Sequence, residues 1–163
     1  MGTDTPRSEF ATHILNEAGT TALLVTHDQY EAFAMADVVG VMQAGRLLQV
    51  DPPDVLWREP ESRAVAGFLG YGPFVAGELS QRLGGPGAAP NKLVGIGPAA
   101  LVPDPTGTAL PVIEQRYQRG EVLVDVRLPD GQVGTVRTAE KVPNGDLALT
   151  LDPSGCVIVP VSH

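Results

Sequence analysis

One short run of residues limits what the first part of this chain can fold into. Thr21-Ala-Leu-Leu-Val-Thr26 is apolar at every inner position, a pattern typical of a strand that is buried on both faces of a parallel sheet. Such a strand needs hydrogen-bonded neighbours on both sides, and the first 70 residues do not contain enough chain to supply them. We therefore expect the tail of an α/β domain that is incomplete here.

The residues around this run predict an alternation of helices and a hairpin. Asp28 and Glu31 form a good helix start, because each carboxylate can accept a hydrogen bond from a backbone N–H at the helix N-terminus. Ala44-Gly45 predicts a turn between two short strands, and Pro53 suits the first turn of a helix. The expected helices cover residues 7–17, 31–37, 53–59 and 63–69, and the expected hairpin covers residues 38–50.

The second half of the chain has a different composition and predicts β structure. After Tyr71 lie 11 of the 15 prolines and 13 of the 19 glycines. Short alternating apolar stretches are separated there by turn signals such as Pro129-Asp-Gly131 and Pro143-Asn-Gly145. The expected strands are residues 93–96, 112–115, 121–128, 132–137, 146–151 and 156–159, with no helix of note among them. They suggest a small antiparallel barrel or sandwich.

These patterns predict an α+β chain with three parts. Residues 1–70 form the tail of an α/β domain, residues 71–91 a linker, and residues 92–163 a small antiparallel β-barrel.

Composition excludes several classes of function. The net charge of −8 and the lack of any stripe of Lys and Arg argue against nucleic-acid binding. No apolar run is long enough to span a bilayer, and the first residues do not resemble a secretory signal. The single cysteine, Cys156, excludes an internal disulfide framework and a Cys-rich zinc site. We expect a soluble, cytoplasmic protein.

His27 is the strongest candidate for a functional residue. It follows the expected strand and precedes a helix start, and ligands of open α/β sheets gather beyond the carboxyl ends of strands. An imidazole there can hydrogen-bond a phosphate oxygen or a reacting water, since one ring nitrogen donates and the other accepts. The alternative is a histidine that only caps a strand–helix turn, and residue spacing alone favours this second interpretation.

Other apparent motifs are rejected. Gly95-Ile-Gly97-Pro-Ala-Ala100 fits a dinucleotide-binding pattern, but the prolines that follow exclude the helix that such a motif needs. Gly85 to Lys92 does not have the spacing of a phosphate loop. The histidines His13, His27 and His163 do not have metal-site spacing, and Ser154 and Cys156 have no nearby histidine to act as a base.

A family resemblance strengthens the functional interpretation of His27. The stretch Leu23-Leu-Val-Thr-His-Asp-Gln29 resembles the end of the ATP-binding subunit of ABC importers, as do the residues that follow it in order: Glu31-Ala32, Met35-Ala-Asp37, Gly45-Arg46, Gln49, Pro53, Pro60 and Phe68-Leu-Gly70. In that family the residue matching His27 is the switch histidine, which contacts the γ-phosphate of ATP and helps hold the attacking water. The β-rich remainder resembles the accessory TOBE-type barrel of importers for iron(III), polyamines, sulfate, molybdate and sugars.

The resemblance also shows what this sequence lacks. The family's phosphate loop, glutamine loop, signature motif and Walker B strand precede the switch histidine, and none occurs here. Gly95-Ile-Gly-Pro-Ala99 stands where the family often has Gly-Ile-Arg-Pro-Glu. We therefore expect a C-terminal fragment that by itself neither binds ATP tightly nor hydrolyses it, with Met1 near a boundary past the family's D-loop.

For the complete subunit the resemblance implies ATP and Mg²⁺ as cofactors. It also implies a second copy and transmembrane permease subunits as partners, a place on the inner face of the membrane, and iron(III), another small oxyanion or a polyamine as cargo. Two other functions stay open for this chain: a stand-alone module that binds a small oxyanion, and a structural dimerisation unit, for which the unpaired strand at residues 21–26 would offer an edge.

Overall fold

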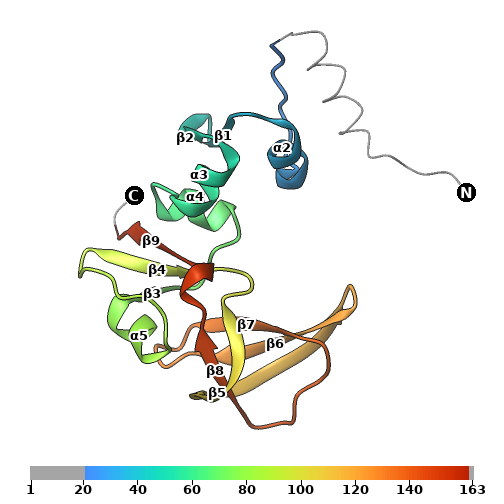
Figure 1. Cartoon of the computed structure of the whole chain (residues 1–163), viewed down its shortest axis with the longest axis vertical. Helices are drawn as coiled ribbons and strands as arrows, with labels where there is room; N and C mark the ends of the chain where they lie inside the picture. The colour runs from blue at the N-terminus through green and yellow to red at the C-terminus, as the bar shows by residue number, and fades with distance from the viewer. Residues whose placement is uncertain (1–20, 162–163) are drawn as a thin grey trace, which may run out of the picture. The chain divides into compact units, whose positions relative to one another are not determined.

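The computed structural model describes residues 21–161 and divides the chain into two compact units, Met1–Trp57 and Arg58–His163. Each unit is described here by itself (Figure 1). The expected helix at residues 7–17 and the histidines His13 and His163 lie outside the described residues. The predicted boundaries at residues 70 and 92 stay a prediction, and residues 71–91 contain a short strand and a helix.

From residue 21 on, the first unit contains a helix, a hairpin and a second helix. Helix α2 (Gln29–Met35) is followed by β1 (Val39–Gln43), β2 (Arg46–Asp51) and α3 (Pro53–Arg58). The hairpin turns at Ala44 and Gly45, which both have positive φ values of 50° and 75°. Two consecutive residues of this kind make the turn whose twist matches a two-stranded ribbon. The predicted hairpin and the helix beginning at Pro53 are thus confirmed.

The expected strand at residues 21–26 does not form. The backbone there has no regular structure, and Leu23 and Val25 are 93% and 88% exposed. The physical reason is the apolar character of both faces, which is also the pattern that predicted the strand. A strand that is apolar on both faces is stable only between neighbouring strands, and among the described residues none pairs with it.

The second unit contains two antiparallel sheets. Strands β3 (Phe74–Ala76), β4 (Lys92–Ile96) and β9 (Cys156–Pro160) form one sheet in the order β3-β4-β9. The other has the order β7-β6-β5-β8, with β5 (Leu101–Gln118), β6 (Glu121–Arg127), β7 (Val133–Thr138) and β8 (Asp146–Leu151). Helices α4 (Arg63–Phe68) and α5 (Gly77–Arg82) and the 3-10 turn η1 (Pro153–Gly155) complete the unit. All six predicted strands are present.

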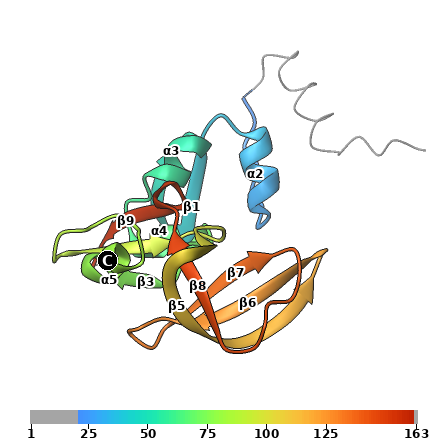
Figure 2. The ribbon, with the colours of Figure 1, turned by 60° about the horizontal axis from the view of Figure 1, so that its bottom comes forward.

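Strand β5 is longer than predicted because it tolerates prolines at irregular positions. Its first half pairs with β8 and its second half with β6, and Figure 2 shows it curving between the two. Pro103 and Thr108 both align with Leu149, so the four residues between them loop out of the ladder. Prolines at such places cost no ladder hydrogen bond. In the sequence, however, the prolines at 103, 105 and 111 argue against a continuous strand, so residues 101–111 were not predicted as one.

The hydrophobic core of the second unit lies mainly between the sheets. The cluster of buried residues includes Val94 and Ile96 from β4, Val124 and Val126 from β6, and Leu149 from β8, all at most 1% exposed. The four-stranded sheet has two edges, β7 and β8, and is therefore open. The structure confirms a mixed helix and strand chain with antiparallel sheets.

Candidate functional site

His27 lies at an exposed bend directly before helix α2. The next residue, Asp28, is the N-cap: its Oδ1 accepts hydrogen bonds from the backbone N–H of Tyr30 at 2.9 Å and of Glu31 at 3.2 Å. This is the helix start that the sequence predicts. The imidazole of His27 is consequently presented to solvent at the start of α2.

Thr26 closes the turn around His27 from the other side. Its Oγ1 accepts a hydrogen bond from the backbone N–H of Asp28 at 3.0 Å and donates one to Glu31 Oε2 at 3.0 Å. Glu31 therefore does not cap a backbone N–H, as the sequence suggested, but holds the threonine hydroxyl. The three side chains fix the backbone on both sides of His27.

Helix α2 is held to the rest of the first unit by an aromatic contact. The rings of Phe33 and Trp57 meet edge to face, with centroids 6.3 Å apart and planes at 86°, and such pairs contribute about 0.5–1.5 kcal/mol beyond area burial. No residue of α2 is fully buried. The helix that follows His27 is thus anchored through few contacts.

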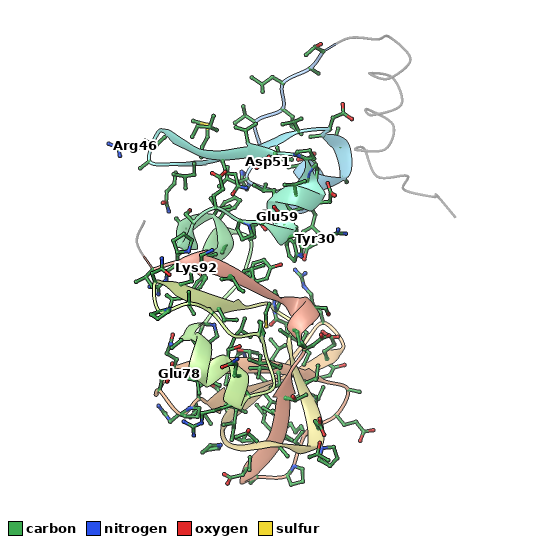
Figure 3. All side chains as sticks on the ribbon, turned by 60° about the vertical axis from the view of Figure 1, so that its left-hand side comes forward. Tyr30, Arg46, Asp51, Glu59, Glu78 and Lys92 are labelled. Atoms are coloured by element: carbon green, nitrogen blue, oxygen red, sulfur yellow. The ribbon has the colours of Figure 1, made fainter. Side chains whose placement is uncertain are left out.

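A second candidate site is an open groove of about 470 Å³ in the second unit. The charged side chains Arg58, Glu59, Glu61 and Lys92 line it together with Pro60 and residues 156–158 and 160. Figure 3 labels Glu59 and Lys92, which come from the segment before α4 and from β4. Sequence reasoning missed this groove, because nothing in the sequence links residues 58–61 with Lys92 and β9. Its mixed charges do not match a site that selects a simple oxyanion.

Cys156 is not a nucleophile in this setting. The thiol is partly buried at the start of β9 and contacts the backbone carbonyl of Asp152 at 3.5 Å. Burial, and secondly the charge of Asp152, raise the pKa of Cys156 to about 11. The thiol is therefore protonated at neutral pH, whereas the thiolate is the reactive form.

The rejected motifs have structural explanations. Gly97 follows β4, and a Cβ at this position would lie 2.3 Å from the carbonyl oxygen of Gly155, so the glycine allows a close backbone approach. The segment before Lys92 contains turns instead of a phosphate loop followed by a helix. In residues 21–161 no group of three or more His, Cys, Asp or Glu side chains could hold a metal ion. No helix among these residues is long and apolar enough to cross a membrane.

Comparison with known proteins identifies the relatives of this chain. It is 45% identical over 105 residues to the Fe(3+) ions import ATP-binding protein FbpC of Streptomyces avermitilis, a match that covers 60% of this chain and 29% of that protein. It is 36% identical over 152 residues to the spermidine/putrescine import ATP-binding protein PotA 1 of Pseudomonas aeruginosa, which covers 79% of this chain and 40% of the relative. The chain is a homologue of ABC importer ATP-binding subunits.

A third relative extends the range of cargo named among the homologues. The sn-glycerol-3-phosphate import ATP-binding protein UgpC 1 of Rhizobium etli is 43% identical over 84 residues, which cover 50% of this chain and 24% of that protein. The chain thus spans between a quarter and two fifths of the length of these relatives. No protein-family model matches it. The resemblance that begins at Leu23 is confirmed, whereas the relatives name different cargoes.

Proposed function

We propose that this chain serves as the C-terminal part of the ATP-hydrolysing subunit of an ABC-type importer. The observation that carries the proposal is the similarity to three importer ATP-binding proteins, which for PotA 1 extends over 79% of the chain. In the complete subunit, ATP and Mg²⁺ are the cofactors, and a second copy and transmembrane permease subunits are the partners. The subunit acts at the cytoplasmic face of the membrane.

His27 is the residue we propose for contact with the γ-phosphate and the attacking water. The surroundings of His27 support this role. Hydrogen bonds of Thr26 and Asp28 fix the backbone on either side of it, while His27 itself is exposed to solvent. A ring so placed can donate one hydrogen bond to a phosphate oxygen and accept another from water. Phosphoryl transfer also needs a lysine and backbone amides on the phosphates and a metal ion, so this chain fits one part of the ATP site and must be completed by others.

Residues 92–163, which make up most of the second unit, are proposed as a TOBE-like regulatory or dimerisation domain. The two open antiparallel sheets of this unit enclose a core of their own, which supports a separate module. We propose iron(III), a polyamine or another small ion as the cargo, since the relatives named for Fe(3+) and for spermidine and putrescine match over the larger parts of the chain.

The test of this function is a chimaera with a relative. This chain replaces the matching region of the Streptomyces avermitilis FbpC, and ATP hydrolysis is measured with and without His27→Ala. We expect the substitution to lower turnover by roughly 10²-fold, the effect of removing one positioned group at a developing charge, with ATP binding unchanged. Tyr30→Ala is the control, because this side chain is 89% exposed in the next helix turn. Unchanged turnover in the His27 variant would refute the assignment.

A further inference from the structure

Strand β9 forms one edge of the three-stranded sheet in the second unit. It pairs with β4, and within residues 21–161 no strand pairs with its other side. Figure 1 shows β9 next to β4, with β3 on the far side of β4. An unpaired edge carries backbone N–H and C=O groups that can bind an additional strand. Which of these groups are available depends on which residues of β9 already bond to β4.

The register decides which backbone groups of β9 point outwards. The N–H of Val161 donates to the carbonyl of Asn91, and the N–H of Gly97 donates to the carbonyl of Gly155. Hydrogen-bonded pairs recur at every second residue of an antiparallel ladder. The N–H and C=O groups that face the free edge therefore belong to the alternate residues Cys156, Ile158 and Pro160.

These outward groups are mostly acceptors. Pro160 has no N–H, and the N–H of Cys156 donates to the carbonyl of Pro153. Outside the ladder, no backbone hydrogen bond among the described residues involves Ile158. The edge thus offers the Ile158 N–H as its donor and the carbonyls of Cys156, Ile158 and Pro160 as acceptors. An added strand with its own N–H groups can satisfy them.

The open groove of about 470 Å³ lies beside this edge and provides charge. It is lined by residues 156–158 and 160 of β9, by the segment 58–61 and by Lys92. Arg58 and Lys92 are exposed and take part in none of the ion pairs formed among the described residues. Glu59 and Glu61 already have partners within the chain. The unpaired charge that the groove presents to a ligand is therefore positive.

We propose that this groove binds an extended acidic peptide segment of another protein, which adds to β9 as an antiparallel strand. In this orientation a single peptide residue can bond both the N–H and the C=O of Ile158. The inference goes beyond the proposed function, because it involves no nucleotide.

The register also indicates where the acidic residue of the peptide belongs. Lys92 stands opposite Pro160 in the β4–β9 pair. A peptide residue opposite Pro160 continues the same row, about 10 Å from the Lys92 backbone. An acidic side chain at that place can meet the lysine ammonium across Pro160. An apolar peptide residue opposite Ile158 would cover a side chain that is 43% exposed.

Other occupants fit this groove less well. A second copy of the chain would bring the same unpaired cations, Arg58 and Lys92, so that like charges would face each other. A small anion could bind these cations, but it would leave the outward N–H and C=O of Ile158 without a partner from a strand. An acidic extended peptide supplies both the charge and the backbone groups.

The experiment uses the full, isotope-labelled chain and the capped peptide acetyl-Glu-Thr-Val-Thr-Val-amide as probe. In the antiparallel register the glutamate of the probe stands opposite Pro160 and its first valine opposite Ile158. The titration is followed by NMR. We expect saturable binding with a dissociation constant below about 1 mM. At saturation the Ile158 amide should shift downfield and exchange its hydrogen roughly tenfold more slowly, since it then donates a hydrogen bond.

Two N-methylated probes test the addition of a strand. Methylation of the first valine removes the N–H that donates to the Ile158 carbonyl, and should weaken binding by roughly tenfold. Methylation of the preceding threonine is the matched control, because its N–H faces away from β9 in an alternating ladder. This control should bind like the unmethylated probe. Both probes leave the protein unaltered, so the comparison does not depend on the folding of a variant.

Lys92→Glu tests the charge of the groove. The substitution should weaken binding of the acidic probe by roughly tenfold and strengthen binding of a probe with lysine in place of glutamate. Lys141→Glu is the matched control, at an exposed lysine in the segment before β8. It should change neither affinity.

Several results would overturn the proposal: no saturable shift at Ile158, equal effects of the two methylations, or an unchanged affinity in the Lys92→Glu variant. Displacement of the probe by an equal concentration of free glutamate would assign the groove to a small anion instead. A shift of the Ile158 amide that depends on chain concentration without probe would assign the edge to a second copy. None of these readouts involves ATP turnover, so the proposed function of His27 stands or fails separately.

Discussion

Asp125 is the most strongly engaged carboxylate on the four-stranded sheet. Its Oδ1 accepts a hydrogen bond from Thr135 Oγ1 at 2.7 Å, its Oδ2 pairs with the guanidinium of Arg116, and the side chain is 14% exposed. Burial raises the pKa of Asp125, but the hydrogen bonds from Arg116 and Thr135 outweigh it, so that the pKa is below the ordinary value. The folded chain therefore holds this carboxylate charged to lower pH than the unfolded chain does.

The lowered pKa of Asp125 predicts a pH-dependent contribution to stability. A depressed carboxylate pKa stabilises the fold above the unfolded pKa of about 3.9, and the contribution is lost as the pH falls through the folded value. Asp125→Asn should lower the free energy of unfolding by about 0.5–1 kcal/mol at pH 7, and by less at pH 3. Urea denaturation at both pH values measures the difference, with Asp130→Asn as an exposed control. A pH-independent difference would contradict the assignment.

Single residues also show where sequence reasoning was sufficient. Asp28 was predicted as a helix start and forms the N-cap with two hydrogen bonds. The partner of Glu31 was not predictable, because Thr26 precedes the helix and its rotamer depends on the bend at His27. The groove beside Lys92 could not be predicted from the sequence either, because the register of β4 against β9 brings together residues, such as Lys92 and Pro160, that are more than 60 positions apart.

At the scale of elements, local patterns predicted the structure where each element supplies its own signal. The hairpin, helices α3 and α4 and six strands follow from alternation, caps and turns. Strand β3 and helix α5 were missed because residues 71–91 are rich in Gly and Pro, which favour a linker. The strand at residues 21–26 was predicted wrongly for the described chain, because its stability depends on neighbours and not on its own residues.

Two glycines show that the effect of a Gly→Ala substitution on stability depends on the element that holds the glycine. Gly67 lies in α4 with no atom within 4 Å of its ideal Cβ position, whereas the Cβ of an alanine at 97 would lie 2.3 Å from the Gly155 carbonyl oxygen. Gly67→Ala should stabilise the fold by about 0.5–1 kcal/mol, because alanine loses less backbone entropy in a helix. Gly97→Ala should destabilise it by roughly 1–3 kcal/mol through the clash with backbone. Thermal unfolding of both variants is the measurement, and equal shifts would contradict the geometry.

At the scale of the whole molecule, the unequal division of the core predicts unequal folding. The second unit contains its own cluster of buried residues, whereas the first contributes Val41 and Leu56 alone among the described residues. Residues 58–163 expressed alone should therefore unfold cooperatively, with a midpoint in urea close to that of the complete chain. Circular dichroism can follow the transition, and so can the near-ultraviolet signal of the tyrosines. Tryptophan does not contribute to that signal, because the single tryptophan, Trp57, lies outside residues 58–163. A non-cooperative transition would show that the second unit needs the first.

The position of β9 at the edge of its sheet has a consequence for how copies of this molecule behave at high concentration. Val161 donates its backbone N–H to Asn91, and Lys92 aligns with Pro160, so in the alternating pattern of an antiparallel ladder Pro160 directs its backbone away from β4. A proline has no N–H to offer an incoming strand. An edge that lacks a donor at this position offers an incoming strand one hydrogen bond fewer, so pairing between copies through β9 is weakened at the same residue that ends the strand.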